Sequence, residues 1–331
     1  MKAVVVRGKM DYSVVADAAR PTAAPGRAVL SISYASLCYR DLLELMGYYP
    51  RMRYPVVLGH EAVGVVEESM DPRYGTGDRV VPMLYEPDGT CDMCLKGEEV
   101  YCRTRRSYGE DVDGFFAEKA AVAANALVKV PPWVSDELAV LVPCVISMVY
   151  KGLRRASLSQ GETVLVTGAG GGVGIHAVQL AKAMGAKVIG VTSHEDKARA
   201  VAKYVDEVII GSKFADEVKK RAGEVDVVVE NVGTPTLGES LRSLRMGGRL
   251  VLIGNVKPDE AYELRLGYAI MKDIAVIGNV AASRGDIWRT FELMRVKTIE
   301  PVVSKYSLEE FDAALDQLRR GDKVGKILLK P

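Results

Sequence analysis

The sequence predicts an α/β protein built from a mainly β domain and a second domain with a doubly wound parallel sheet. Three observations support this prediction. A chain of 331 residues exceeds what one ordinary core encloses and suits two domains. Short β-branched runs fill residues 1–145, whereas apolar strands alternate with helical periods over 146–281.

The composition is that of a globular protein and excludes several classes of function. Apolar residues make up 48% of the chain and charged residues 26%. The 44 Lys and Arg balance the 43 Asp and Glu, so no excess positive charge favours nucleic acid. The first residues lack the apolar stretch of a signal peptide, and no apolar run long enough to span a membrane follows. We therefore expect a cytoplasmic protein that binds neither nucleic acid nor membrane.

Residues 1–145 are expected to form an antiparallel, partly barrel-like β domain. Segments such as 56–58 (VVL) and 63–66 (VGVV) are typical of short strands, and 75–78 (GTGD) is typical of a turn.

The parallel sheet is expected from six apolar strands separated by helical periods. These strands are 163–167, 187–191, 206–210, 225–229, 248–253 and 274–277. Strands spaced by helices in this way predict a doubly wound sheet, of the Rossmann type.

The last part of the chain is expected to return to the first domain. It contains helical stretches at 286–296 and 308–320 and a final strand at 324–329. The predicted division is therefore 1–145 with 282–331 for the β domain, and 146–281 for the parallel domain.

A glycine-rich loop lies between the strand 163–167 and the helical stretch 175–184. Its predicted binding residues are Gly168, Gly170, Gly171, Gly172, Val173 and Gly174. Glycine lets the backbone approach a pyrophosphate, whose charge is stabilised by free N–H groups at the helix N-terminus. The loop therefore predicts a dinucleotide site, although a tight turn alone is the simpler alternative.

The residue that follows the expected strand 187–191 favours NADP(H) over NAD(H). Dinucleotide domains that prefer NAD place a carboxylate there for the ribose hydroxyls, and this chain has Thr192. Thr192, Ser193 and Lys197 can donate hydrogen bonds to a 2′-phosphate, which no carboxylate repels. The alternative is an ordinary solvated helix start. Four residues after later strands are also assigned to the cofactor: Asn231, Gly233, Gly254 and Asn255.

Three of the five cysteines fall within one short loop. Cys91, Cys94 and Cys102 follow Asp88 at spacings that suit a tetrahedral structural zinc ion. Asp88 is the expected fourth ligand because its spacing to Cys91 repeats that from Cys91 to Cys94. Other acidic candidates are Asp92, Glu98 and Glu99, and free surface cysteines are the alternative to a metal site.

A second constellation is spread along the first domain. Cys38, His60 and Cys144 together provide two thiolates and an imidazole, which would leave an open position on a catalytic zinc ion. Taken singly, buried cysteines are common core residues, and a lone histidine is often only a hydrogen-bonding group.

In order and spacing, these residues resemble the medium-chain dehydrogenase/reductase superfamily, which includes the zinc-dependent alcohol dehydrogenases, along the whole chain. The resemblance implies a GroES-like catalytic domain with a structural zinc lobe at 86–104. It implies that Cys38, His60 and Cys144 are catalytic zinc ligands and that Glu61 can enter the metal's shell. It also implies a homodimer or homotetramer, and the strand 274–277 would offer a sheet edge for such pairing.

Three residues depart from that pattern. Asp88 replaces a cysteine of the lobe, and Ala169 stands in the loop where alcohol dehydrogenases tend to have glycine. Arg40 replaces the Ser or Thr that relays a proton from the alcohol, a task for which arginine stays too firmly protonated. Arg40 could instead pair with Glu61 or a thiolate and disfavour zinc, or donate to a developing enolate. Occupancy of the catalytic site therefore stays open.

A closer likeness is to the acryloyl-coenzyme A reductases of this superfamily. The matching segments are 37–43 (LCYRDLL), 47–52 (GYYPRM), 87–91 (PDGTC) and 141–144 (LVPC). We therefore expect NADPH-dependent reduction of a ketone or aldehyde, or of an activated C=C bond in an enoyl thioester. The alternative is a protein that binds NADP(H) without turnover.

Overall fold

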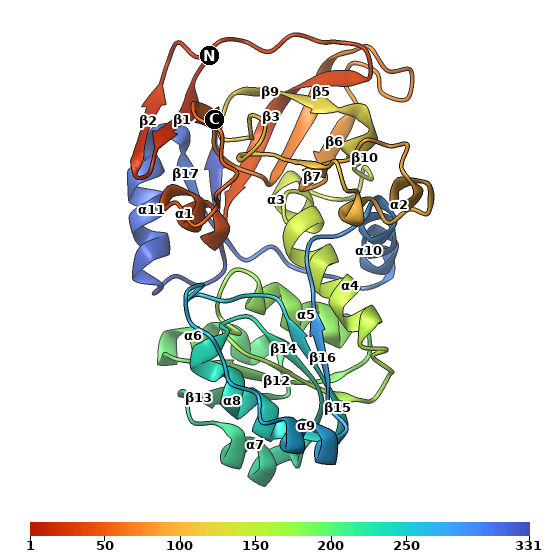
Figure 1. The fold of residues 1–331 in the computed structure, drawn as a ribbon, viewed down its shortest axis with the longest axis vertical. Coiled ribbons are helices and arrows are strands. Elements are labelled where there is room, and N and C mark those ends of the chain that lie inside the picture. Colours follow the sequence, from red (N-terminus) through yellow and green to blue (C-terminus); the bar gives the residue numbers. More distant parts are fainter.

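The structure is a computed structural model that describes residues 1–331. Two bodies lie one above the other along its long axis (Figure 1). The upper body contains both ends of the chain and all of the antiparallel strand pairs, and the lower body is formed by the middle of the chain. None of the helices has the length and apolar character that crossing a bilayer requires.

The upper body contains three sheets. A three-stranded sheet has the order β2-β1-β4, a seven-stranded sheet has the order β10-β6-β5-β3-β18-β17 with β9 also on β3, and β7 pairs with β8. The strands are β1 (Ala3–Gly8), β2 (Asp11–Val15), β3 (Arg27–Leu37), β4 (Val56–Val57), β5 (Ala62–Ser69), β6 (Arg79–Pro82), β7 (Tyr85–Glu86), β8 (Arg106–Ser107), β9 (Lys119–Ala123), β10 (Leu127–Lys129), β17 (Val303–Ser307) and β18 (Lys326–Lys330).

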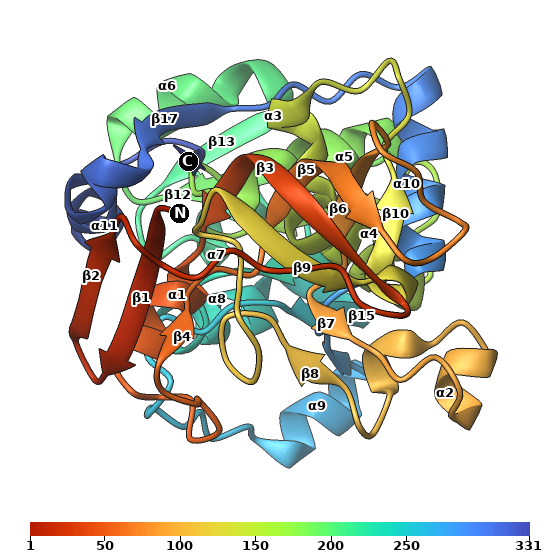
Figure 2. The same ribbon diagram turned by 90° about the horizontal axis from the view of Figure 1, so that it is seen from above.

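The helices of the upper body cover its sheets, and most of them are short. They are α1 (Tyr39–Leu45), α2 (Asp92–Leu95), η1 (Glu99–Tyr101), η2 (Ala124–Ala126), α3 (Asp136–Ala139), α10 (Arg284–Val296), η5 (Leu308–Glu310) and α11 (Phe311–Arg320). Phe311 of α11 packs on Phe116, with ring centroids 5.7 Å apart, and both side chains are fully buried. Seen from above, the lobe with α2 projects on the side away from β1, β2 and α11 (Figure 2).

The lower body contains the doubly wound sheet. Its six strands are all parallel, in the order β13-β12-β11-β14-β15-β16, which confirms the α/β class. The strands are β11 (Thr163–Val166), β12 (Lys187–Thr192), β13 (Glu207–Ile210), β14 (Val225–Glu230), β15 (Leu244–Leu252) and β16 (Ala275–Gly278). Burial on both faces explains why the central strands are continuous apolar runs.

The helices of the lower body are α5 (Gly174–Ala183), α6 (Glu195–Val201), η4 (Ala202–Tyr204), α7 (Ala215–Ala222), α8 (Thr234–Ser243) and α9 (Leu266–Lys272). Strand β15 begins four residues before its expected start at residue 248. The extra residues form an irregularity in its pairing with β14, which Gly247 permits with a φ of +71°.

Two connections join the bodies. The π-helical turn η3 (Val142–Ile146) runs into α4 (Ser147–Arg155), and the chain returns after β16. Lys151 of α4 donates to the carbonyl oxygens of Val280 (2.7 Å) and Ala281 (3.2 Å), and so ties the two connections together. The predicted division at 145/146 and 281/282 falls in these segments, and we keep it as a proposal.

Candidate active site

A cleft of about 1010 Å³ lies between the two bodies. One wall is formed by the glycine-rich loop and by the ends of β12, β14 and β15, and the other by α1, His60, Cys144 and the segment before β18. The carboxyl ends of a doubly wound sheet are where such folds bind ligands.

The glycine-rich loop is tightly packed at four positions. Gly168 has a φ of +59°, and a Cβ on Gly174 would lie 2.1 Å from the carbonyl oxygen of Gly168. A Cβ on Gly172 would lie 2.9 Å from the Lys326 side chain, and one on Gly170 would lie 2.6 Å from Lys197. The backbone therefore reaches the cleft only because these side chains are absent.

The predicted cofactor residues divide into two groups. Those that line the cleft are Gly168, Gly171, Gly172, Val173, Gly174, Thr192, Ser193, Lys197, Asn231, Gly254 and Asn255. Gly170 and Gly233 lie outside the lining. Gly170 accepts a hydrogen bond from the Gly325 N–H (3.0 Å), and Gly233 donates to the buried carboxylate of Glu230 (3.0 Å).

At the end of β12, Thr192 and Lys197 line the cleft, and neither side chain is hydrogen-bonded to a carboxylate. The hydroxyl of Thr192 is buried and has no hydrogen-bond partner, and Lys197 donates only to the carbonyl of Gly321. Arg319 and Lys323 line the same cleft from the far end of the chain, and sequence reasoning missed both. Burial and the charge of Lys326 lower the pKa of Lys323 to about 7.

The structure brings the scattered cysteine and histidine residues together. Ligand atoms of Cys38, His60 and Glu61 lie within 4.8 Å of one another, and Cys144 Sγ lies 3.9 Å from His60 Nε2. Asp41, which sequence reasoning missed, holds the other ring nitrogen, His60 Nδ1, at 2.8 Å. Such a partner fixes the orientation of a metal-ligating histidine.

Glu61 is paired with a lysine that sequence reasoning also missed. Lys326 Nζ lies 2.8 Å from Glu61 Oε1, and both side chains are buried. Although burial opposes its protonation, Cys38 and Glu61 keep the pKa of Lys326 above its ordinary value. Glu61 Oε2 has no hydrogen-bond partner, and Oε1 also lies 3.5 Å from His60 Nε2.

The expected pairing of Arg40 with Glu61 or a thiolate is wrong. Arg40 Nε donates to Glu44 Oε1 (2.6 Å) and Nη2 to Glu110 Oε2 (3.1 Å), and its guanidinium lies over the Tyr49 ring. The physical reason is that Glu44 lies one turn further along α1, while Lys326 already neutralises Glu61.

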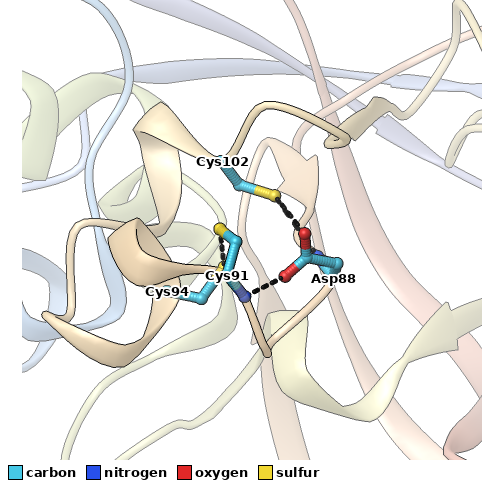
Figure 3. Close-up of side chains that lie close together, drawn as sticks. All are labelled: Asp88, Cys91, Cys94 and Cys102. Carbon is cyan, nitrogen blue, oxygen red and sulfur yellow. Dashed lines mark hydrogen bonds between the residues drawn. The ribbon is translucent and has the colours of Figure 1, made fainter.

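The segment between β7 and β8, which contains α2 and η1, holds a second cluster of side chains (Figure 3). The side chains of Asp88, Cys91, Cys94 and Cys102 all offer ligand atoms within 4.8 Å of one another. Asp88 Oδ1 accepts from the Cys91 N–H (2.8 Å), and Oδ2 accepts from Thr104 and Cys102. The hydrogen bonds from Thr104 and the backbone hold the pKa of Asp88 well below its usual range.

The other acidic residues of this loop lie outside the cluster. Glu99 is instead near Arg284, with 3.7 Å between Oε1 and Nε. Three thiols and one carboxylate at this spacing form a donor set that suits Zn²⁺.

A doubly wound parallel domain and a β domain meet at a cleft that contains a Cys, His and Glu cluster. This combination defines the medium-chain class of dehydrogenases and reductases. Residues 24–132 match the family model of the alcohol dehydrogenase GroES-like domain, and 172–295 match that of the zinc-binding dehydrogenases. The chain belongs to the medium-chain dehydrogenase/reductase superfamily and is an oxidoreductase of that type.

Two relatives are similar over their full length. A protein named acryloyl-coenzyme A reductase from Metallosphaera sedula is 55% identical over 332 residues, 99% of each chain. One of the same name from Sulfurisphaera tokodaii is 51% identical over 335 residues, 100% of each chain. Among solved structures, a cobalt- and zinc-bound thermostable alcohol dehydrogenase from Pyrobaculum aerophilum has a TM-score of 0.89 at 30% identity. The match to that structure covers 100% of this chain and 99% of the chain of the alcohol dehydrogenase.

Proposed function

We propose that the protein uses NADPH to reduce the C=C bond of an α,β-unsaturated acyl thioester such as acryloyl-coenzyme A. The full-length likeness to two proteins named acryloyl-coenzyme A reductase carries this proposal. Arg40, which lines the cleft, supports it, because a guanidinium cannot relay the proton that alcohol oxidation requires.

The nicotinamide dinucleotide would supply the hydride. The N–H groups of the glycine-rich loop would bind its pyrophosphate at the start of α5. Thr192, Ser193 and Lys197 would bind the 2′-phosphate, and the unpartnered Thr192 hydroxyl supports this assignment. Asn231, Gly254 and Asn255 would bound the cofactor from the ends of β14 and β15.

Asp88, Cys91, Cys94 and Cys102 would hold one structural zinc ion, which stabilises the fold of the lobe. Their convergence is the supporting observation. A carboxylate in place of a thiolate leaves the formal charge of the donor set unchanged.

A second candidate function is reduction of a ketone or aldehyde. It is favoured by the approach of Cys144 to the Cys38, His60 and Glu61 cluster, a donor set that suits zinc. A metal there would supply Lewis acidity toward a carbonyl oxygen. In either function Asp41 orients His60, and Lys326 balances the charge of Glu61.

We also propose a homodimer or homotetramer. Strand β16 lies at one edge of the parallel sheet, where Val276 is 45% exposed. The neighbouring helix α9 exposes Leu266, Ile270 and Met271. An apolar edge of this kind suits pairing with a second copy across a two-fold axis.

The deciding experiment measures zinc per chain in protein purified without added metal, together with NADPH oxidation on an enoyl-coenzyme A thioester and on ketones. Turnover of the thioester with one zinc ion per chain supports the first function. Turnover of ketones alone with two zinc ions supports the second. NADPH binding with no turnover of either substrate would support a protein that binds the cofactor without catalysis.

A further inference from the structure

We propose that Arg40 and Ser107 form an oxygen-binding subsite that holds the thioester carbonyl of the substrate and stabilises the enolate formed from it. This inference rests on the proposed reduction of an enoyl thioester. Both residues line the cleft on the wall opposite the cofactor loop, and the subsite requires no metal ion.

Arg40 is held in place by two buried carboxylates. Its Nε donates to Glu44 Oε1 (2.6 Å) and its Nη2 to Glu110 Oε2 (3.1 Å). The Tyr49 ring centroid lies 5.1 Å from the guanidinium carbon and covers one face. The remaining nitrogen, Nη1, has no hydrogen-bond partner within the protein, and the side chain borders the cleft. The guanidinium is therefore fixed with one end available to a ligand.

Ser107 offers the second donor. The residue is 1% exposed, and its hydroxyl has no hydrogen-bond partner. Leaving a buried hydroxyl unpartnered is costly, and a ligand oxygen would remove that cost. The Ser107 N–H donates to Asp111 Oδ2 (2.9 Å), which fixes the backbone that carries the hydroxyl.

The two donors belong to one structural unit. The N–H of Glu110, whose carboxylate binds Arg40, donates to the carbonyl oxygen of Ser107 (3.3 Å). Ser107 also pairs with Tyr85 across β7 and β8, and Tyr85 also lines the cleft. Glu110 thus links the Arg40 guanidinium to the backbone of Ser107, and both residues line the cleft.

The subsite matches the charge that develops in the reaction. The β-carbon of the substrate would accept a hydride from the reduced nicotinamide. The C=C electron pair would then form a double bond between the α-carbon and the carbonyl carbon, and the C=O pair would move to the oxygen to give the enolate. Arg40 and Ser107 hydrogen-bond that oxygen. A proton from water then adds to the α-carbon, which leaves the saturated thioester and the oxidised cofactor. Preorganised donors at a developing oxyanion are among the largest contributions to catalysis.

The test compares Ser107→Ala and Arg40→Met with the wild type in NADPH-dependent reduction of acryloyl-coenzyme A. For Arg40→Met we expect kcat to fall about 100-fold or more, and for Ser107→Ala about tenfold. KM should change by less than about threefold, because the charge forms only in the transition state. The Kd for NADPH and the zinc content should stay at wild-type values in both variants.

Ser36→Ala is the matched control. Ser36 is also buried with an unpartnered hydroxyl, but it lies in β3 outside the cleft lining, so kcat should not change. Arg40→Met leaves two carboxylates unpaired and can fail to fold. If it does, the activity of Ser107→Ala alone tests the proposed subsite. Wild-type kcat in Ser107→Ala, or an equal loss in Ser36→Ala, would overturn the subsite alone. A wild-type protein inactive on every enoyl thioester would overturn the proposed function and the subsite with it.

Discussion

Lys326 Nζ and Glu61 Oε1 form an ion pair of 2.8 Å inside the protein, between residues separated by 265 positions. Neither side chain is more than 3% exposed. A buried pair is stable only while both charges are present, because each would otherwise remain in a medium that solvates it poorly.

Replacing Lys326 by Met should therefore destabilise the protein strongly. We expect the free energy of unfolding to fall by about 3–5 kcal/mol, since Glu61 is left as an uncompensated buried charge. Urea unfolding measures the loss. Lys330→Met, at the exposed end of the same strand, is the control. Equal, small effects of both substitutions would show that the buried pair does not stabilise the fold.

Replacing Asp88 by Ala should weaken zinc binding in the lobe. We expect affinity to fall about 100-fold or more, because even loss of an outer-shell partner of a ligand costs 10–100-fold. Competition with a chelator, followed by metal analysis, measures the change, and Asp88→Cys should retain zinc. Asp92→Ala is the control, since Asp92 lies outside the cluster. If Asp92→Ala alone released zinc, Asp88 would not be the ligand.

Replacing Lys197 by Gln should raise the Kd for NADPH about tenfold and leave that for NADH nearly unchanged. The reason is that a charge-assisted hydrogen bond to the 2′-phosphate is worth roughly 1.5–3 kcal/mol. Quenching or enhancement of cofactor fluorescence on binding measures both constants. Arg199→Gln on the same helix is the control, because Arg199 pairs with Asp196 in solvent. Equal weakening of both cofactors would argue against a 2′-phosphate contact at Lys197.

Lys323 should make stability depend on pH. Its pKa is about 7 in the folded protein against 10.5 for an ordinary lysine, so the unfolded state binds more protons between pH 7 and 10.5. Stability therefore rises with pH across this window, by up to about 1.4 kcal/mol per pH unit from this group. Lys323→Met should be more stable than the wild type at pH 7, and the gap should close toward pH 10.

Urea unfolding at pH 7, 8 and 9 tests this difference. Lys220→Met, an exposed position on α7, should leave the pH dependence of the wild type unchanged. Parallel curves for the wild type and Lys323→Met would contradict the lowered pKa.

Replacing Val276 by Lys should dissociate the proposed oligomer. A charge placed on an edge strand opposes pairing with a second copy. Sedimentation velocity measures the mass, and Val296→Lys on α10, also exposed and apolar, is the control. A wild-type monomer, or an unchanged mass for Val276→Lys, would argue against pairing through β16.

The sequence predicts most of the parallel domain because its signals are local. The strand at 163–167, the glycine-rich loop and the helix after it are contiguous, and the structure contains them as β11, the loop and α5 (Gly174–Ala183). The last strand was expected from residue 324 but begins at Lys326. The difference arises because Gly325 has a φ of +73° and its N–H donates to the carbonyl oxygen of Gly170 instead of to a neighbouring strand.

The site could be predicted only in part, because several of its partners are set by folding. The residue types at positions 38, 60 and 144 carry a chemical signal of their own. Nothing local to Asp41 or Lys326 indicates that one supports His60 and the other neutralises Glu61. The contact of Arg40 with Glu110 could not be predicted for the same reason, since Glu110 is 70 residues away, whereas its contact with Glu44 lies within one helical turn.

The placement of β18 against β3 has a consequence for how the protein is made. Leu37, next to Cys38, pairs with Ile327 of β18. This strand is synthesised only after the entire parallel domain. Ala35, Ser36 and Leu37 of β3 therefore lack this partner strand while a second domain is synthesised. Contacts so distant in sequence fold slowly, and an uncovered edge strand favours aggregation.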